Sequence, residues 1–580
     1  MDRACGETEP VLGEGSLRPV GSNSDILKPR PSNVAITNDD SGHYRGLPGI
    51  DTNAVPFAPI QLLPFELLST LFKLCVGDKT PVRDLISLTL VCKLWQRIVE
   101  DTPSLWCCIS GWETAPRVRK GLAMAKDAPL KIMYREDVAE TDPETFFGEI
   151  GGRITQWKSL NITTGRSDLP MTAIQATIPP NLETLQVNVP WGQEWTRGLV
   201  TLFRGEPAPL TLKRLYVHQI PVVVEPLRLS GLRSLGLSRM PGVSAEEILR
   251  VLRESPALER CYLYYLRGLE NFGLPGQEQE LSRLQKVETP NIHLAHLRSL
   301  SLCGLPVSFV HLFLSVIHAP NLQWFAVDCK IDRHAQSPRS ELFTARISHH
   351  SPTLTALIKT AQNMELVSFS DANWKISVGN LFITLEGLAF KLKHLDETLE
   401  WLFSHLGGHL KTLPVGLSLH ESEINTSSFT QLTSALKVTK LDLWTASSFE
   451  HLPDSQPRNI ISHLSQPLES RPAQWVLPHL EYLSTNVVNE DGKSRILEMV
   501  KARHTFIGAQ LERTPNGGDI ALKPLREIRL RGGRNGISRD HLSHTHFLIA
   551  LQNAARGAEI WWEEVKWTGS EDWKAAMTLN

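Results

Sequence analysis

A short apolar pattern that recurs along the chain after residue 155 constrains the fold more than any other feature. Each copy has the form apolar-x-x-apolar-x-apolar, and its last three positions alternate as in a half-buried β-strand. Clear copies are Leu182/Leu185/Val187, Leu212/Leu215/Val217, Leu232/Leu235/Leu237 and Leu297/Leu300/Leu302. Helical periodicity, as at 245–253, separates several of them. A strand followed by a helix in each unit predicts a solenoid of stacked repeats.

The spacing of the copies predicts that this solenoid is irregular. The middle apolar positions 160, 185, 215, 235 and 261 are separated by 25, 30, 20 and 26 residues. Beyond residue 325 the spacing rises to as much as 45. We therefore expect an irregular α/β solenoid over residues 155–560, with the aromatic segment that begins at Trp561 packed against its last repeat.

Residues between the apolar positions of each strand are expected to project from the opposite face of the sheet. They are Gln186, Asn188, Tyr216, His218, Tyr262, Tyr264, Ser301 and Asp328. Tyrosine provides contact area at low entropic cost, so Tyr262 and Tyr264 are the best candidates for binding. The candidate substrate-binding set is Tyr216, His218, Tyr262, Tyr264 and Asp328. The alternative for each is a side chain that simply faces solvent.

A different pattern occupies the segment before the repeats. Residues 60–75 predict an amphipathic helix with Pro64 in its first turn, and a second helix is expected from about Val82 to Asp101. Pro103 ends that helix, and a short apolar segment follows. Three short helices in about fifty residues have little core of their own, and such modules often gain stability from a partner.

The residues from Leu63 to Ile109 resemble an F-box. The opening block Leu-Pro-Phe-Glu-Leu-Leu lies at 63–68, the second block at 88–95, and the closing Pro-Ser-Leu-Trp at 103–106. Leu94 departs from the family, which often has Arg or Lys before the tryptophan. Further along, Ser-Pro-Ala-Leu-Glu (255–259) and Ala-Pro-Asn-Leu-Gln (319–323) are similar to leucine-rich-repeat F-box proteins of mushroom-forming fungi.

This resemblance implies a fold and a role. The fold would be α/β, with a three-helix F-box followed by an irregular leucine-rich-repeat-like solenoid. The F-box would dock on the Skp-type adaptor, and through it on the cullin, of an SCF (Skp–cullin–F-box) ubiquitin ligase, while the rest of the chain holds a protein substrate. The alternative is a non-catalytic scaffold that binds the adaptor without directing ubiquitination. The expected adaptor-binding residues are Leu63, Pro64, Leu67, Leu68, Phe72, Val91, Trp95, Leu105 and Trp106.

These observations together predict the domain organisation. Residues 1–58 are rich in Gly, Pro, Ser, Asn and Asp and are expected to form a disordered tail. The remaining divisions are an F-box at 59–112, a linker or helical connection at 113–154, the solenoid at 155–560 and a C-terminal cap at 561–580.

Charge and cysteine content argue against several classes of protein. The 60 basic and 62 acidic side chains give a net charge of −2, which does not favour nucleic-acid binding. No run of apolar residues is as long as the roughly 18 residues needed to span a bilayer. Eight cysteines without a CxxC pair favour a reducing compartment. We expect a protein of the cytoplasm and/or nucleus that binds neither nucleic acid nor membrane.

Patterns suggestive of chemical sites are weak. His541, His544 and His546 have no Cys or Glu to complete a metal site, and an exposed helix start is favoured. Gly492-Lys493-Ser494 lacks the earlier glycine of a phosphate loop. We expect no cofactor, no metal and no catalytic residue, and hence no enzyme. One basic cluster is predicted to line a solvated face, with an acidic partner as the alternative: Arg526, Arg529, Arg531, Arg534 and Arg539.

Overall fold

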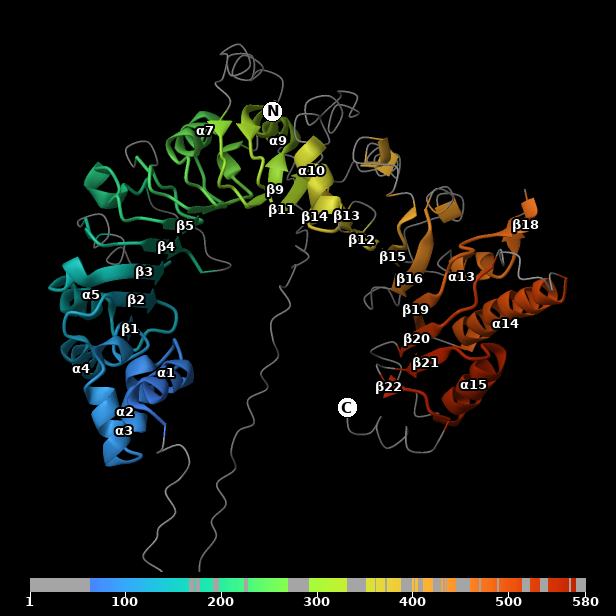
Figure 1. Ribbon diagram of the computed structural model, residues 1–580, viewed down its shortest axis with the longest axis horizontal. Coiled ribbons are helices and arrows are strands. Elements are labelled where there is room, and N and C mark those ends of the chain that lie inside the picture. Colours follow the sequence, from blue (N-terminus) through green and yellow to red (C-terminus); the bar gives the residue numbers. More distant parts are fainter. Residues whose placement is uncertain are drawn as a thin grey trace, which may run out of the picture. The chain divides into compact units, whose positions relative to one another are not determined.

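The computed structural model describes residues 63–165, 178–190, 198–223, 228–269 and 292–330, and most of 351–569 with short gaps (Figure 1). The helices and strands below all belong to one compact unit, Pro64–Asn580. The tail expected at 1–58 lies outside the described residues. The described chain is mixed α/β, with a helical N-terminal region followed by a long strand-rich sheet.

The helical region differs from the prediction in where its second helix ends. Its elements are α1 (Phe65–Cys75), α2 (Pro81–Thr89), α3 (Lys93–Glu100) and the 3-10 turn η2 (Pro103–Leu105). The single helix expected from Val82 to Asp101 is wrong, because Cys92 is fully extended and interrupts it. At about 100° per residue, Leu85 and Ile98 would face nearly opposite sides of one straight helix. The break allows both side chains to be buried.

Aromatic contacts hold these short helices together. The rings of Phe72 and Trp95 lie 4.8 Å apart and join α1 to α3. Trp106 is fully buried, and its indole Nε1 donates a hydrogen bond of 2.7 Å to the carbonyl of Val99. These contacts fix the angles between the helices, so the side chains that point away from them have defined positions.

The sheet begins at the end of the segment predicted as the F-box (59–112) and continues through the segment predicted as a linker (113–154). Strands β1 (Cys108–Ser110), β2 (Leu130–Arg135) and β3 (Trp157–Thr163) are parallel and paired. Helices α4 (Ala115–Ala125) and α5 (Pro143–Gly151) connect them. Leu130, Ile132 and Tyr134 alternate inward, which is strand periodicity without the leucine pattern that marked the later copies.

The next strands follow the apolar pattern closely. They are β4 (Thr184–Asn188), β5 (Arg214–His218), β6 (Ser234–Ser238), β7 (Arg260–Tyr264), β9 (Ser299–Pro306) and β11 (Trp324–Lys330). All pair in parallel, and their buried middle residues align across the sheet. That row is Leu160, Leu185, Leu215, Leu235, Cys261, Leu300 and Phe325. Helices α7 (Ala245–Glu254) and α9 (Val307–Val316) lie on one side of these strands (Figure 1).

A common turn precedes each of these strands. The amides of Leu182, Leu212 and Leu258 each donate to the carbonyl three residues earlier. Side chains then link one turn to the previous one: the Ser255 hydroxyl donates to the carbonyl of Leu229 at 2.8 Å. The Asn321 amide likewise donates to the carbonyl of Ala295 at 2.8 Å. The Ser-Pro-Ala-Leu and Ala-Pro-Asn-Leu segments therefore stack the units.

Residues 364–386 break the parallel order. Of strands β12 (Met364–Ser370), β13 (Asn373–Val378) and β14 (Leu381–Glu386), the middle one, β13, is antiparallel to both others, and β14 rather than β12 pairs with β11. Only Gly379 and Asn380 separate β13 from β14, and Gly379 has φ +57. A connection this short permits a hairpin but not the longer crossover that parallel strands need.

Parallel pairing resumes in the C-terminal part. Its strands are β15 (Val415–His420), β16 (Val438–Trp444), β19 (Tyr482–Val487), β20 (Glu527–Gly532) and β21 (Glu559–Trp562), followed by the antiparallel β22 (Val565–Lys566). Helices α14 (Glu490–Arg513) and α15 (His541–Ala554) lie together beside β19–β21 (Figure 1). Trp562 and Trp567 are buried at this end of the sheet.

The remaining elements are short. They are η3 (Ile154–Gln156), η4 (Leu202–Gly205), η5 (Arg267–Leu269), β8 (Ile292–His293), β10 (Ile317–His318), α10 (Ser351–Ile358), α13 (Asn459–His463), β17 (Pro467–Leu468) and β18 (Arg471–Trp475). In all the parts of the chain that the structure describes, no helix is long and apolar enough to cross a bilayer.

Candidate functional site

Exposed apolar side chains concentrate on the helical region. Seven of the twelve large hydrophobic residues that are exposed in the described chain lie between residues 65 and 94. We call this set the apolar helical surface: Phe65, Leu67, Leu71, Leu74, Leu90, Val91 and Leu94. Leu74 and Leu90 are 78% and 80% exposed. Apolar side chains gathered in this way on a small element are typical of a protein-binding surface.

The structure divides the predicted adaptor-binding residues into two groups. Pro64, Leu67 and Val91 are exposed, and Leu63 and Trp95 are half-buried. The others have at most 5% of their surface exposed, so they support the surface from beneath: Leu68, Phe72, Leu105 and Trp106. The set therefore mixes surface and core, and its role in binding stays a prediction.

Five exposed members of the apolar helical surface were absent from the predicted set. They are Phe65, Leu71, Leu74, Leu90 and Leu94. The signal that identifies part of this group is helical spacing, because Leu67, Leu71 and Leu74 recur at four and three residues along one face of α1. Leu90 and Leu94 became exposed through the break between α2 and α3, which sequence periodicity did not reveal.

Buried Glu113 ties α2 to the beginning of the sheet. Its Oε1 accepts a hydrogen bond of 2.8 Å from the backbone N–H of Arg83 in the first turn of α2. Its Oε2 lies 3.6 Å from Nη1 of Arg117. Burial raises the pKa of this carboxyl, and the Arg83 amide and the Arg117 charge oppose that rise. A side chain from outside the helix thus caps α2.

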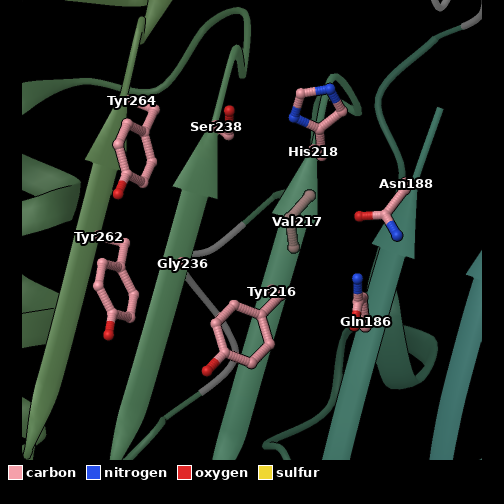
Figure 2. A pocket seen from close by; sticks show the side chains of 9 residues that line it. All are labelled: Gln186, Asn188, Tyr216, Val217, His218, Gly236, Ser238, Tyr262 and Tyr264. Atoms are coloured by element: carbon pink, nitrogen blue, oxygen red, sulfur yellow. The ribbon is translucent and has the colours of Figure 1, made fainter. Parts of the chain in front are cut away.

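A second candidate surface lies on β4–β7. The side chains that alternate with the buried row form an open hollow of about 430 Å³, seen in Figure 2. Its lining residues are Gln186, Asn188, Tyr216, Val217, His218, Gly236, Ser238, Tyr262 and Tyr264. We call the outward residues of β4–β7 the tyrosine face. The lining of the hollow has no acidic or basic side chain other than His218, and it combines three tyrosine rings with amide and hydroxyl groups.

Contacts within the sheet hold the tyrosine rings in place. The hydroxyls of Tyr216 and Ser234 share a hydrogen bond of 2.7 Å. A methyl group added at Gly236 would lie 2.4 Å from Cδ1 of Tyr216, so the ring occupies the space that a side chain on β6 would fill. The rings of Tyr262 and Tyr264 are stacked, with centroids 6.3 Å apart and planes inclined by 9°. Burial raises the pKa of Tyr264, and its hydrogen bond with Ser301 opposes that rise.

The structure brings together four of the five predicted substrate-binding residues. Tyr216, His218, Tyr262 and Tyr264 all line the hollow. Asp328 lies on β11 beside an irregularity in the strand register, and it does not line the hollow. Burial, followed by the nearby charge of Arg239, lowers the pKa of His218. His218 is therefore neutral near pH 7.

The weaker sequence patterns gain no chemical role from the structure. Arg526 pairs with Glu481 at 3.0 Å, and Arg529 pairs with Glu527, so acidic neighbours already neutralise part of the arginine cluster. The ring of His544 packs against Trp562, 4.8 Å between centroids. In the described part of the chain, no group of three or more His, Cys, Asp or Glu side chains could hold a metal ion.

Comparison with known proteins identifies one domain. Residues 60–110 match the F-box-like family, which covers the apolar helical surface. No curated protein matches the chain. F-box domains typically bind Skp-type adaptors, and F-box proteins are generally non-catalytic.

Proposed function

We propose that this protein is the substrate-recognition subunit of an SCF-type ubiquitin ligase. Its F-box-like helices would dock on the Skp adaptor, and its strand-rich region would hold a protein substrate. The chain itself would be non-catalytic, since it would position the substrate for the ubiquitin-charged enzyme of the assembly.

The observation that carries this proposal is the coincidence of a family match with an exposed apolar surface. Residues 60–110 match the F-box-like family, and seven exposed apolar side chains lie within that range. Leu67 and Leu74 are 52% and 78% exposed, so a partner that covers them would remove apolar area from water at about 25 cal/mol per Å². This favours stable association rather than a brief encounter.

The parallel strands support a leucine-rich-repeat-like solenoid as the substrate-binding part. The aligned buried row and the linked turns at Ser255 and Asn321 are what stacked repeats require. The antiparallel strands at 364–386 interrupt that regularity. Solenoids of this kind generally bind partners on the sheet face.

Adaptor binding tests the first half of the proposal. Full-length protein carrying Leu67→Asp and Leu74→Asp should capture purified Skp adaptor at least about ten-fold less well than the unchanged chain. The matched control is Leu199→Asp with Leu210→Asp, which alters two equally exposed leucines, 69% and 85% exposed, outside the F-box-like region. Equal capture by all three proteins would refute the proposal. The full chain is needed because Glu113 and α4 complete the packing of α2.

The alternative is a scaffold that binds the adaptor without directing ubiquitination. Turnover of a bound partner separates the two functions. In cells, a substrate receptor predicts that the partner's half-life lengthens when Leu67→Asp/Leu74→Asp replaces the unchanged chain. A scaffold predicts that the half-life stays the same although adaptor binding is lost.

A further inference from the structure

We propose that the tyrosine face binds an acidic peptide segment of a partner protein, with Arg214 and Arg260 contacting its carboxylates. This deepens the proposed function by naming the chemistry of the substrate, and it rests on that function only in taking the partner to be the substrate. Binding itself requires only the residues of β4–β7.

Two arginines flank the tyrosine rings on the same face of the sheet. Arg214 begins β5 and Arg260 begins β7, and both are exposed. Each lies two residues before a tyrosine of the face, Tyr216 and Tyr262, so strand alternation places it on that face. One strand separates them, which spaces their backbones about 10 Å apart. Neither guanidinium has an ion-pair partner among the described residues.

Several basic residues near Arg214 and Arg260 do have ion-pair partners. Glu183 lies 3.8 Å from Lys158 and 3.2 Å from Lys213, and Glu259 lies 3.3 Å from Arg233. On the tyrosine face itself, the twelve outward positions of β4–β7 include no acidic residue. They are Thr184, Gln186, Asn188, Arg214, Tyr216, His218, Ser234, Gly236, Ser238, Arg260, Tyr262 and Tyr264.

The charge of the surrounding segment favours an acidic ligand. Residues 198–269 carry ten basic and six acidic side chains, an excess of four positive charges, whereas the whole chain has a net charge of −2. A positive surface steers an acidic partner towards itself and disfavours a basic one. The ion-paired residues at the edge contribute little to this field, which leaves Arg214 and Arg260 on the face itself, and Arg239 near His218, as its nearest sources.

The tyrosines supply the apolar part of the contact. The rings of Tyr216, Tyr262 and Tyr264 lie along one face with their hydroxyls pointing the same way (Figure 2). The hydroxyl of Tyr216 is already bonded to Ser234, and that of Tyr264 to Ser301. A ligand can therefore cover the rings of Tyr216 and Tyr264 without leaving their hydroxyls unsatisfied, and these rings lose little freedom on binding.

Aromatic rings beside arginines also bind single-stranded nucleic acid, but the charges favour a peptide. A nucleic-acid strand needs a continuous basic groove along its phosphates. Here Lys158 and Lys213 are engaged by Glu183, and two guanidiniums cannot form such a groove. Two separated cations suit two acidic side chains on either side of an apolar one.

The test is selection of peptides on the full chain. A random library of twelve-residue peptides displayed on phage is panned against the immobilised protein. Asp and Glu should exceed Lys and Arg in the recovered peptides, and Arg214→Glu/Arg260→Glu should reverse that preference. A fluorescein-labelled copy of the most enriched peptide should bind this variant about ten-fold or more weakly by anisotropy. The control Arg253→Glu/Arg556→Glu makes the same charge change at exposed sites outside the face and should bind normally.

Tyrosine variants, an oligonucleotide and adaptor capture complete the experiment. Tyr262→Ala/Tyr264→Ala should weaken the peptide about ten-fold, whereas Tyr262→Phe/Tyr264→Phe should retain most of the affinity. Recovered peptides without acidic bias, or equal binding by the arginine variant and its control, would overturn the inference. So would tighter binding of a twelve-nucleotide oligouridine than of the peptide. Adaptor capture is measured on the same samples: capture without acidic selection refutes this inference alone, and loss of capture refutes the proposed function.

Discussion

The apolar helical surface and the tyrosine face both present large side chains to solvent, but these side chains make different contacts on the two surfaces. On the helices, aliphatic side chains such as Leu74 and Leu90 are exposed, and they form no hydrogen bond that would offset the free-energy cost of placing apolar surface in water. On the sheet, Tyr216 bonds to Ser234 through its hydroxyl and packs its ring over Gly236. Under the proposed function, a lasting partner would cover the first surface, whereas the second tolerates solvent and would suit a partner that binds and dissociates.

The difference follows from the kind of element that carries each surface. Three short helices enclose too little volume to bury all their apolar residues, so some stay outside. A parallel strand buries one row of side chains and presents the other, and the next strand offers each outward side chain a bonding partner. Exposed apolar side chains therefore concentrate on the small module, and half-buried tyrosines line the sheet face.

The largest effect expected is on the helical module, from Phe72→Ala. Phe72 is buried and its ring packs at a tilt against Trp95, so its removal should lower the free energy of unfolding of the module by about 3–5 kcal/mol. Leu74→Ala, two residues away and 78% exposed, should change it by less than about 0.5 kcal/mol. Urea unfolding followed by tryptophan fluorescence compares the two. Similar losses in both variants would mean that Leu74 is not a surface residue.

A smaller loss of stability is expected from a substitution at the junction between the helices and the sheet. Glu113→Ala removes the acceptor of the Arg83 amide and should destabilise α2 by about 1–3 kcal/mol. Glu113→Gln keeps an acceptor oxygen and should lose less. Hydrogen exchange of the α2 amides measures the difference. Unchanged exchange in the alanine variant would show that the helical module does not depend on the sheet for this cap.

On the tyrosine face, a single methyl group should disturb one ring. Gly236→Ala would bring Cβ to 2.4 Å from Tyr216 and should cost about 1–3 kcal/mol as the ring moves. Gly416→Ala, on β15, is the matched control because its nearest neighbour would lie at an ordinary 3.6 Å. Thermal unfolding compares the two, and equal midpoints would mean that the Tyr216 ring is free to move aside.

The smallest expected effect is on the pH dependence of stability, and it arises from His218 on the tyrosine face. Burial and Arg239 lower the pKa of His218 below its ordinary value of 6.5, so the unfolded chain binds a proton before the folded chain does. The stability associated with neutral His218 is present above pH 6.5 and is lost as pH falls towards the folded pKa. His218→Gln should reduce the fall in melting midpoint between pH 7.5 and pH 5.5. An unchanged fall would exclude His218 as its source.

Local patterns predicted much of this structure. The alternation at Leu185, Leu215 and Leu235 located three strands and their shared register, and the Leu-Pro-Phe-Glu block located α1. The same patterns missed the break at Cys92 and the strands before residue 155. Both errors have one cause, since periodicity over a few residues reports a preferred element but not where neighbouring elements force it to stop.

The sequence by itself determined the position of α1 and of strands such as β4, β5 and β6, because apolar spacing sets the face that must be buried. It also determined the match to the F-box-like family, which lies in residues 60–110. Tertiary structure alone decided which apolar residues are core and which are surface. Phe72 and Leu74 are both apolar residues of one helix, and only the position of Trp95 buries the first. Likewise, β4–β7 bring Tyr216, His218, Tyr262 and Tyr264 together because parallel pairing places residues distant in sequence side by side.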